Sequence, residues 1–135
     1  MTSSNFFERL GAPLRNIRWS WGAKREDGSI VLKVWKDRVE NRDGRTFVML
    51  THHAKYIHRQ SHSGYRERNC HVRKIKEGAV CHMVMCEVVD LAAAPRKIRT
   101  FDQDYIYEGR GLSEYDGDYW IEIVEKLPAS SFFIQ

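Results

Sequence analysis

An apolar run at residues 79–90 (AVCHMVMCEVVD) constrains the fold of this chain more than any other feature. Its side chains alternate between two faces, and both faces are mostly apolar. A strand with two apolar faces has to be covered on both sides, so the run predicts a central strand bounded by Gly78 and Asp90. We expect His82, within the run, to be a hydrogen-bonded core histidine, because buried polar groups are normally paired.

The residues before this run predict an amphipathic helix that ends at Gly78, a common C-terminal stop. A helical wheel gives it a narrow packing edge made of Tyr65, Arg68, Val72 and Ile75. A second face is cationic and holds Arg66, Asn69, Arg73 and Lys76, with Lys74 beyond them. Such a face is either an ordinary solvated helix surface or a contact for phosphates.

Two Asp-Gly turns, at 27–28 and 43–44, separate three β-rich runs. They predict an antiparallel meander of strands at 17–23, 30–38 and 47–51. We also expect a short helix within 2–15, capped by Ser3 or Ser4, a loop at 52–63 and a short strand at 96–101. A variable acidic stretch at 102–115 and a turn at 115–117 lead to a closing strand at 118–124. The chain then continues as a tail at 127–135 whose apolar end docks on the body.

The length of 135 residues predicts one domain, residues 1–135, of the α+β class with a mainly antiparallel sheet. No apolar run approaches the ~18 residues that a membrane span needs. The N-terminus lacks the pattern of a secretory signal. Three cysteines without a paired framework favour a reducing cytoplasm.

Charge is distributed unevenly along the chain. Residues 1–76 hold 17 Lys/Arg and 7 Asp/Glu, whereas residues 77–135 hold 5 and 11. The asymmetry indicates a polar partner, or self-association of a basic patch with an acidic patch, unless the two halves neutralise each other within one fold.

The sequence offers few signals for catalysis. His and Cys residues between 52 and 86 lack the spacing of a zinc site, so we expect no metal and no cofactor. The only candidates for a metal-dependent nuclease are carboxylates: Asp102, Asp104, Glu122 and Glu125, with Lys126 nearby. Phosphate-cradling glycine loops are absent, which argues against nucleotide hydrolysis and dinucleotide chemistry. No catalytic residue is assigned.

The tryptophans are a stronger lead. On the expected strands, Trp19 and Trp21 share one face and Trp35 lies on the neighbouring strand, close to several cations. Indoles beside cations suit base stacking or the enclosure of an extruded base. Ordinary core packing is the alternative explanation, and for Trp19 and Trp21 it is the one that the pattern favours.

The order of short strands, a basic helix and a glycine-initiated strand (KEGAVCHMVMCEVVD) resembles the PUA-like superfamily, in particular the EVE-type readers of modified bases. The resemblance covers mainly residues 64–90 and the Trp-rich start. It implies a small, partly closed β-barrel with one or two flanking helices. It also implies nucleic-acid binding through an aromatic pocket, often in restriction, defence or RNA-modification systems.

The leading hypothesis is therefore a non-catalytic nucleic-acid-binding module, in its narrower form a reader of DNA or of a modified base. In the expected site the phosphates are held by Arg66, Arg73 and Lys74. The lip of the site lies within 61–65 and includes Ser61, Ser63 and Tyr65. The base is contacted by some of Trp19, Trp21 and Trp35. A small metal-dependent nuclease or toxin and a homodimeric protein-interaction module remain as alternatives.

Overall fold

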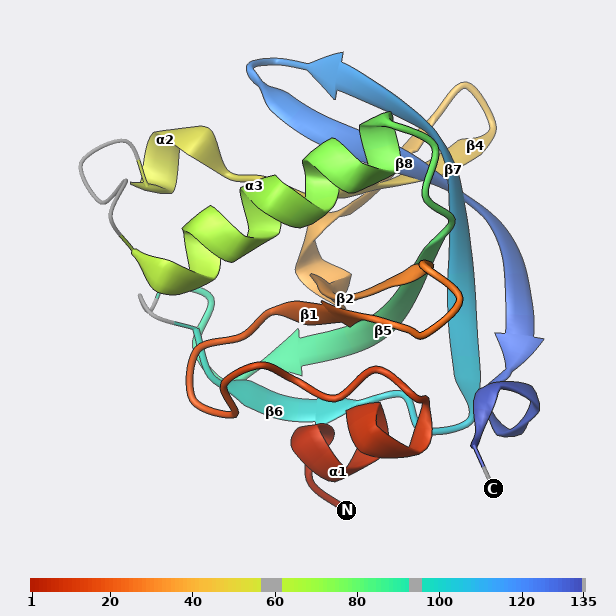
Figure 1. Cartoon of the computed structure of the whole chain (residues 1–135). Helices are drawn as coiled ribbons and strands as arrows, with labels where there is room; N and C mark the ends of the chain where they lie inside the picture. Colours follow the sequence, from red (N-terminus) through yellow and green to blue (C-terminus); the bar gives the residue numbers. More distant parts are fainter. Residues whose placement is uncertain (57–61, 93–95, 135) are drawn as a thin grey trace.

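The computed structural model describes residues 1–56, 62–92 and 96–134 (Figure 1). In chain order its elements are α1 (Ser3–Arg9), β1 (Gly22–Lys24), β2 (Ile30–Trp35), the 3-10 turn η1 (Lys36–Arg38), β3 (Val39–Arg42), β4 (Arg45–Met49), α2 (His53–Tyr56), α3 (Ser63–Lys76), β5 (Cys81–Val88), β6 (Ile98–Phe101), β7 (Tyr105–Tyr115), β8 (Asp118–Pro128) and the 3-10 turn η2 (Ala129–Phe132).

The described strands form one eight-stranded sheet in the order β1-β2-β5-β7-β8-β4-β3, with β6 paired to the end of β5. Every pairing is antiparallel except that of β2 with β5. The α+β class and the mainly antiparallel sheet are thus confirmed. Within the described residues the two edge strands, β1 and β3, do not pair with each other, so the sheet is not a closed barrel. In the described part of the chain three α-helices accompany the sheet, rather than one or two.

The predicted central strand is confirmed as β5, which pairs with β2 on one side and with β7 and β6 on the other. The side chains from Cys81 to Val84 are all buried. His82 departs from the expectation, because its buried Nδ1 has no hydrogen-bond partner among the described residues and its ring lies edge-on to Phe132 at 4.8 Å. Burial lowers the pKa of His82, which favours the neutral ring, and the contact with Phe132 packs it.

The predicted meander is confirmed in its first pairing, the antiparallel β1–β2 hairpin at Asp27-Gly28, and wrong in its second, because β2 does not pair with β4. The parallel β2–β5 ladder joins Ile30 to Cys81 and Trp35 to Cys86, and β4 pairs with β8 instead of β2. The expected strand at 17–23 shrinks to Gly22–Lys24. Its first half is a turn because Asn16 accepts hydrogen bonds from the backbone of Arg18 and Ser20, and such local bonds compete with a strand ladder.

The turn predictions hold. Asp43 and Gly44 both have positive φ (53° and 78°) in the β3–β4 hairpin, as do Asp116 and Gly117 (53° and 83°) between β7 and β8. Two-residue hairpin turns require this backbone, which Asp-Gly adopts readily. The acidic stretch at 102–115, expected to be irregular, is mostly strand β7.

The sheet is covered on both faces (Figure 1). On one face α1 and the C-terminal tail bury a cluster around Phe6, Phe7 and Leu10, and the Ile134 amide bonds to the Arg9 carbonyl at 2.9 Å. The docking of the tail is confirmed, although α1 is capped by Thr2 and not by Ser3 or Ser4. On the other face α3 covers a second apolar cluster. None of the described helices is long and apolar enough to span a membrane.

Candidate functional site

Helix α3 positions the candidate site. Its buried residues are Gly64, Tyr65, Arg68, Val72 and Ile75, which confirms the predicted packing edge and adds a glycine to it. A Cβ atom at Gly64 would lie 2.7 Å from the Trp21 indole and 2.8 Å from the Trp19 carbonyl. The first turn of α3 therefore rests directly on the segment that carries two of the predicted tryptophans.

Glu67 fixes that segment from the helix. Its two carboxylate oxygens accept hydrogen bonds from the Ser20 hydroxyl at 2.9 Å and from the Trp21 amide at 3.0 Å. The Ser20 carbonyl in turn accepts a bond from the buried Nζ of Lys33 at 3.2 Å, and burial lowers the pKa of that lysine. Side-chain hydrogen bonds thus hold the chain on both sides of Ser20.

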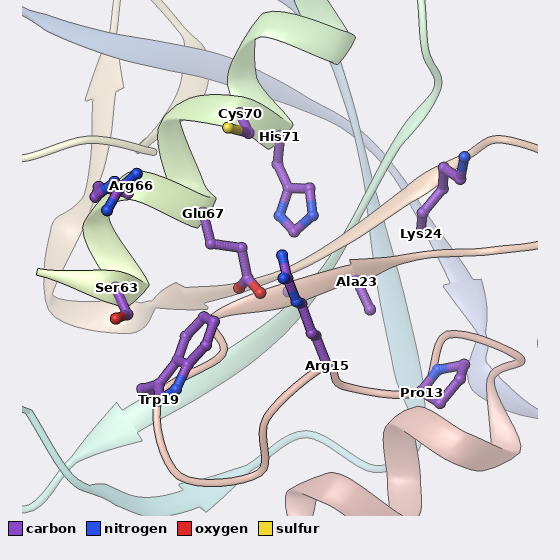
Figure 2. A pocket seen from close by; sticks show the side chains of 11 residues that line it. Pro13, Arg15, Trp19, Ala23, Lys24, Ser63, Arg66, Glu67, Cys70 and His71 are labelled. Atoms are coloured by element: carbon purple, nitrogen blue, oxygen red, sulfur yellow. The ribbon is translucent and has the colours of Figure 1, made fainter.

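A groove of about 480 Å³ opens beside this contact, and we call it the α3 groove (Figure 2). Its walls come from residues 13–24 and from α3: Pro13, Arg15, Trp19, Gly22, Ala23, Lys24, Ser63, Arg66, Glu67, Cys70 and His71. Figure 2 shows Arg15 extending toward α3, from which Glu67 and His71 point into the groove. The half-buried Trp19 indole supplies the aromatic wall.

The lining of the α3 groove carries more positive than negative charge. Arg15, Lys24 and Arg66 are exposed cations, whereas Glu67 is the one carboxylate in the lining. Burial, and then the charge of Arg68, lowers the pKa of His71 to about 4, so this ring is neutral at pH 7. Its buried Nδ1 has no hydrogen-bond partner within the described structure.

A second, more enclosed space of about 20 Å³ is lined in part by Trp21, and we call it the arginine cavity. Its lining combines three arginines with aromatic and apolar side chains: Trp21, Trp35, Arg38, Met49, Leu50, His52, Tyr56, Arg68 and Arg96. The volume suffices for about one water-sized group. Trp21 packs at 5.3 Å from the ring of Tyr56 and at 5.6 Å from that of His62.

Arg68 is the most buried cation of the cavity, with 3% of its surface exposed. Its guanidinium donates to the backbone carbonyls of Leu50, Trp21 and Lys33 and lies over the Trp21 ring at 5.8 Å. Burial lowers its pKa to about 10, so it remains charged at pH 7.

Arg96 and Arg38 complete the cationic wall. Arg96 holds both oxygens of Asp37, at 2.8 and 2.7 Å, and lies 5.2 Å from the centre of the Trp35 ring. Burial and the nearby Arg96 lower the pKa of Arg38. The Nε atoms of Arg68 and Arg96 and the Nδ1 of His52 are buried without partners in the described structure. A buried, unpaired polar atom typically costs about 1–3 kcal/mol.

The predicted site residues separate into several places. Trp19, Ser63 and Arg66 line the α3 groove, whereas Trp21 and Trp35 line the arginine cavity. Tyr65 does not form a lip, because it is buried against Tyr56 with ring centres 4.9 Å apart. Arg73 and Lys74 are exposed further along α3, outside the groove lining, and Ser61 lies outside the described residues.

Several lining residues were not among the predicted site residues: Arg15, Lys24, Glu67 and His71 in the groove, and Arg38, His52, Arg68 and Arg96 in the cavity. Arg68 did carry a signal, since a charged residue on the packing edge of a helix has to find buried partners. Arg15 and Arg96 are ordinary basic residues in the sequence, and nothing local marks them.

Two of the four carboxylates proposed for metal chemistry, Asp102 and Glu122, have structural partners. Asp102 accepts bonds from the amides of Asp104 and Tyr105 and from the Tyr107 hydroxyl. Glu122 pairs with Arg45 at 2.8 Å. Among the described residues no group of three or more His, Cys, Asp or Glu side chains is arranged to hold a metal ion. The nuclease alternative remains a hypothesis that this arrangement does not favour.

The fold and these two spaces define a small α+β protein with a cationic groove beside an arginine-lined cavity. Comparisons with protein-family models, with curated proteins and with solved structures find no match to this chain. The resemblance to the PUA-like superfamily therefore stays a prediction.

Proposed function

We propose that this protein is a nucleic-acid-binding module whose α3 groove holds the sugar-phosphate backbone while Trp19 stacks on a base. One observation carries the proposal: three exposed cations from two separate segments, Arg15, Lys24 and Arg66, surround a half-buried indole in one groove. Phosphate contacts by Lys and Arg supply most of the affinity of such modules, and a neighbouring aromatic ring adds stacking.

The dimensions and charges of the groove support this assignment. A volume of about 480 Å³ lies within the roughly 300–1,000 Å³ typical of ligand sites. Among the described residues, no ion pair engages Arg15, Lys24 or Arg66. Arg73 and Lys74 continue the positive surface along the exposed side of α3, where they can contact further phosphates.

The narrower hypothesis is a reader of a modified base in a curved, incompletely closed sheet of the PUA-like kind. Trp21 and Trp35 line a cavity that holds only about one water-sized group, so in this form the base itself would lie against Trp19 in the groove. The three cysteines are all free thiols, which favours a reducing, cytoplasmic setting.

The test is the salt dependence of binding to fluorescently labelled single-stranded DNA, single-stranded RNA and duplex DNA. Anisotropy titrations between 50 and 200 mM salt should show affinity that falls steeply with salt. The double variant Arg15→Ala/Arg66→Ala should reduce the slope of log K against log salt by about 1.4–1.8, because each lost phosphate contact is worth about 0.7–0.9.

The matched control is Arg99→Ala/Lys126→Ala, which removes the same charge from exposed positions on β6 and β8. It should leave the slope nearly unchanged. Trp19→Ala should weaken binding by about 1–3 kcal/mol without changing the slope. Affinity that is independent of salt, or equal loss of slope in both double variants, would contradict the groove as the phosphate site.

A further inference from the structure

The second apolar cluster, which α3 covers in part, has an end that the helix leaves open. Four strands each contribute one side chain that packs on this cluster and stays only partly buried: Val39 of β3, Met85 of β5, Tyr107 of β7 and Ile123 of β8. The preceding side chain on the same face of β5, Met83, is fully buried. Exposure therefore increases along β5 toward an apolar surface that four strands build together.

These four side chains line a pocket of about 670 Å³, which we call the open-end pocket. Phe101 of β6 adds an aromatic wall, and none of the described α-helices contributes to the lining. The pocket shares no lining residue with the α3 groove. Its volume lies within the roughly 300–1,000 Å³ typical of small-molecule sites, which are often found where a curled sheet opens.

Asp102 is the carboxylate that the fold fixes at this pocket. Its amide donates to the Met85 carbonyl at 2.9 Å, which places the residue beside the apolar surface. Its Oδ1 accepts bonds from the amides of Asp104 and Tyr105, and its Oδ2 accepts one from the Tyr107 hydroxyl at 3.2 Å. Burial, and then the charge of Asp102, raises the pKa of Tyr107, so this hydroxyl keeps its proton. Since a carboxylate has about four acceptor positions, one on Oδ2 is left for a ligand.

The charge of Asp102 has no matching cation. Among the described residues, no ion pair engages it. Lys36 is the cation of the lining, and its Nζ lies 4.0 Å from Glu87, with both side chains exposed. Lys126 of β8 has its Nζ over the Tyr105 ring at 4.1 Å. An apolar surface beside a fixed, unpaired carboxylate suits a ligand that joins an apolar body to an ammonium group.

We propose that the open-end pocket binds a small amphipathic amine. The apolar body of the ligand lies on Met85, Tyr107 and Ile123, and its ammonium group donates to Oδ2 of Asp102. The rings of Phe101 and Tyr107 add faces that attract a cation. The pocket and the α3 groove thus take ligands of opposite charge, so this inference does not rest on the proposed function.

The test is an NMR titration of the full chain labelled with ¹³C at the methionine methyl groups. The probe is 2-phenylethylamine, which has both the apolar ring and the ammonium group. It should move the Met85 signal with a Kd in the millimolar range, as expected for a ligand of about nine heavy atoms, and leave the signals of Met1 and Met49 in place. Three matched probes each change one feature: 2-phenylethanol has a hydroxyl for the ammonium, 3-phenylpropionate has a carboxylate, and ethylamine lacks the ring. Each should bind about tenfold more weakly, because it loses the charged hydrogen bond or the buried apolar area.

The variant Asp102→Asn keeps the shape and one acceptor oxygen and removes the charge. It should weaken binding of 2-phenylethylamine about tenfold and leave that of 2-phenylethanol nearly unchanged, so the ratio between the two probes falls toward one. Asp104→Asn removes a neighbouring exposed carboxylate that does not line the pocket, and as the matched control it should keep the ratio. Thr100→Phe, at an exposed lining position of β6, should fill the pocket and abolish the Met85 shift with every probe.

A Met85 signal that stays in place at about 10 mM 2-phenylethylamine, tenfold above the expected Kd, would overturn the proposal. So would equal or tighter binding of 3-phenylpropionate, or a probe ratio that Asp102→Asn leaves unchanged. The groove variant Arg15→Ala/Arg66→Ala should not alter these titrations. Probe binding without salt-dependent binding of oligonucleotides would keep the pocket and remove the groove function, and the reverse result would keep the groove and overturn the pocket.

Discussion

Arg68 joins three parts of the structure, and its removal should cost more stability than that of any other basic residue on α3. Its guanidinium donates to the carbonyl of Leu50 after β4, to that of Trp21 before β1, and to that of Lys33 within β2. The substitution Arg68→Met keeps most of the side-chain length and apolar stem and removes the donors together with the buried charge.

The magnitude follows from these three contacts. A buried acceptor left without its donor costs about 1–3 kcal/mol, so three carbonyls give a gross loss of about 3–9 kcal/mol. Part of this is returned because a buried guanidinium is itself unfavourable, as its pKa of about 10 indicates. We expect a net loss of about 3–5 kcal/mol, which is a large share of the roughly 5–15 kcal/mol that holds a typical domain folded.

Urea unfolding followed by tryptophan fluorescence and by far-UV circular dichroism measures this loss through the transition midpoint and slope. Arg68→Lys keeps a charge but not the planar fork, so it should lose nearly as much as Arg68→Met. Arg73→Met, on the exposed side of the same helix, should stay within about 0.5 kcal/mol of the parent protein. A loss below about 1 kcal/mol for Arg68→Met would refute the view that these contacts tie the three segments together.

Three further predictions concern residues next to the groove. Gly64→Ala should lower the free energy of unfolding in urea by about 1–2 kcal/mol, because the new Cβ would lie 2.7 Å from the Trp21 indole and this clash outweighs the better helix propensity of alanine. A stabilised variant would show that this contact is loose. His71 has a pKa of about 4 in the folded protein and near 6.5 when unfolded, so the free energy of unfolding should fall as the pH drops from 6.5 to 4. With allowance for the partial exposure of the ring, the fall is about 1–2 kcal/mol. The variant His71→Gln should lose less stability over the same pH range. Ellman's reagent should modify only Cys70 in the folded protein, because burial raises the pKa of the other two thiols to about 12, and Cys70→Ser should abolish that native reaction.

The parts of the fold that the sequence predicts are those encoded locally. The Asp43-Gly44 and Asp116-Gly117 turns need only their own positive φ angles, and the structure has both hairpins. Helix α3 is specified by its own periodicity and by Gly78, which has a φ of 114°. The strand β5 is recognisable because two apolar faces demand cover from both sides.

Strand pairing is the part that local patterns do not encode. Successive hydrophobic runs separated by tight turns favour pairing between neighbours, yet β2 pairs with β5, which follows it by about fifty residues, in parallel. Strand β7 was not recognised because its acidic, glycine-containing sequence has low strand propensity. Its long antiparallel pairing with β8 stabilises it instead.

Trp19 and Trp21 show why only half of the candidate site was predictable from the sequence. A strand places residues i and i+2 on the same face, so Trp19 and Trp21 were expected to act together. The turn at Asn16 and the hydrogen bonds that Glu67 accepts from Ser20 and Trp21 replace that geometry. One indole then lines the open groove and the other lines the closed cavity. A departure from regular structure, held by the carboxylate of Glu67, thus places the two indoles in different spaces, and the Trp19→Ala titration tests the groove side of this division.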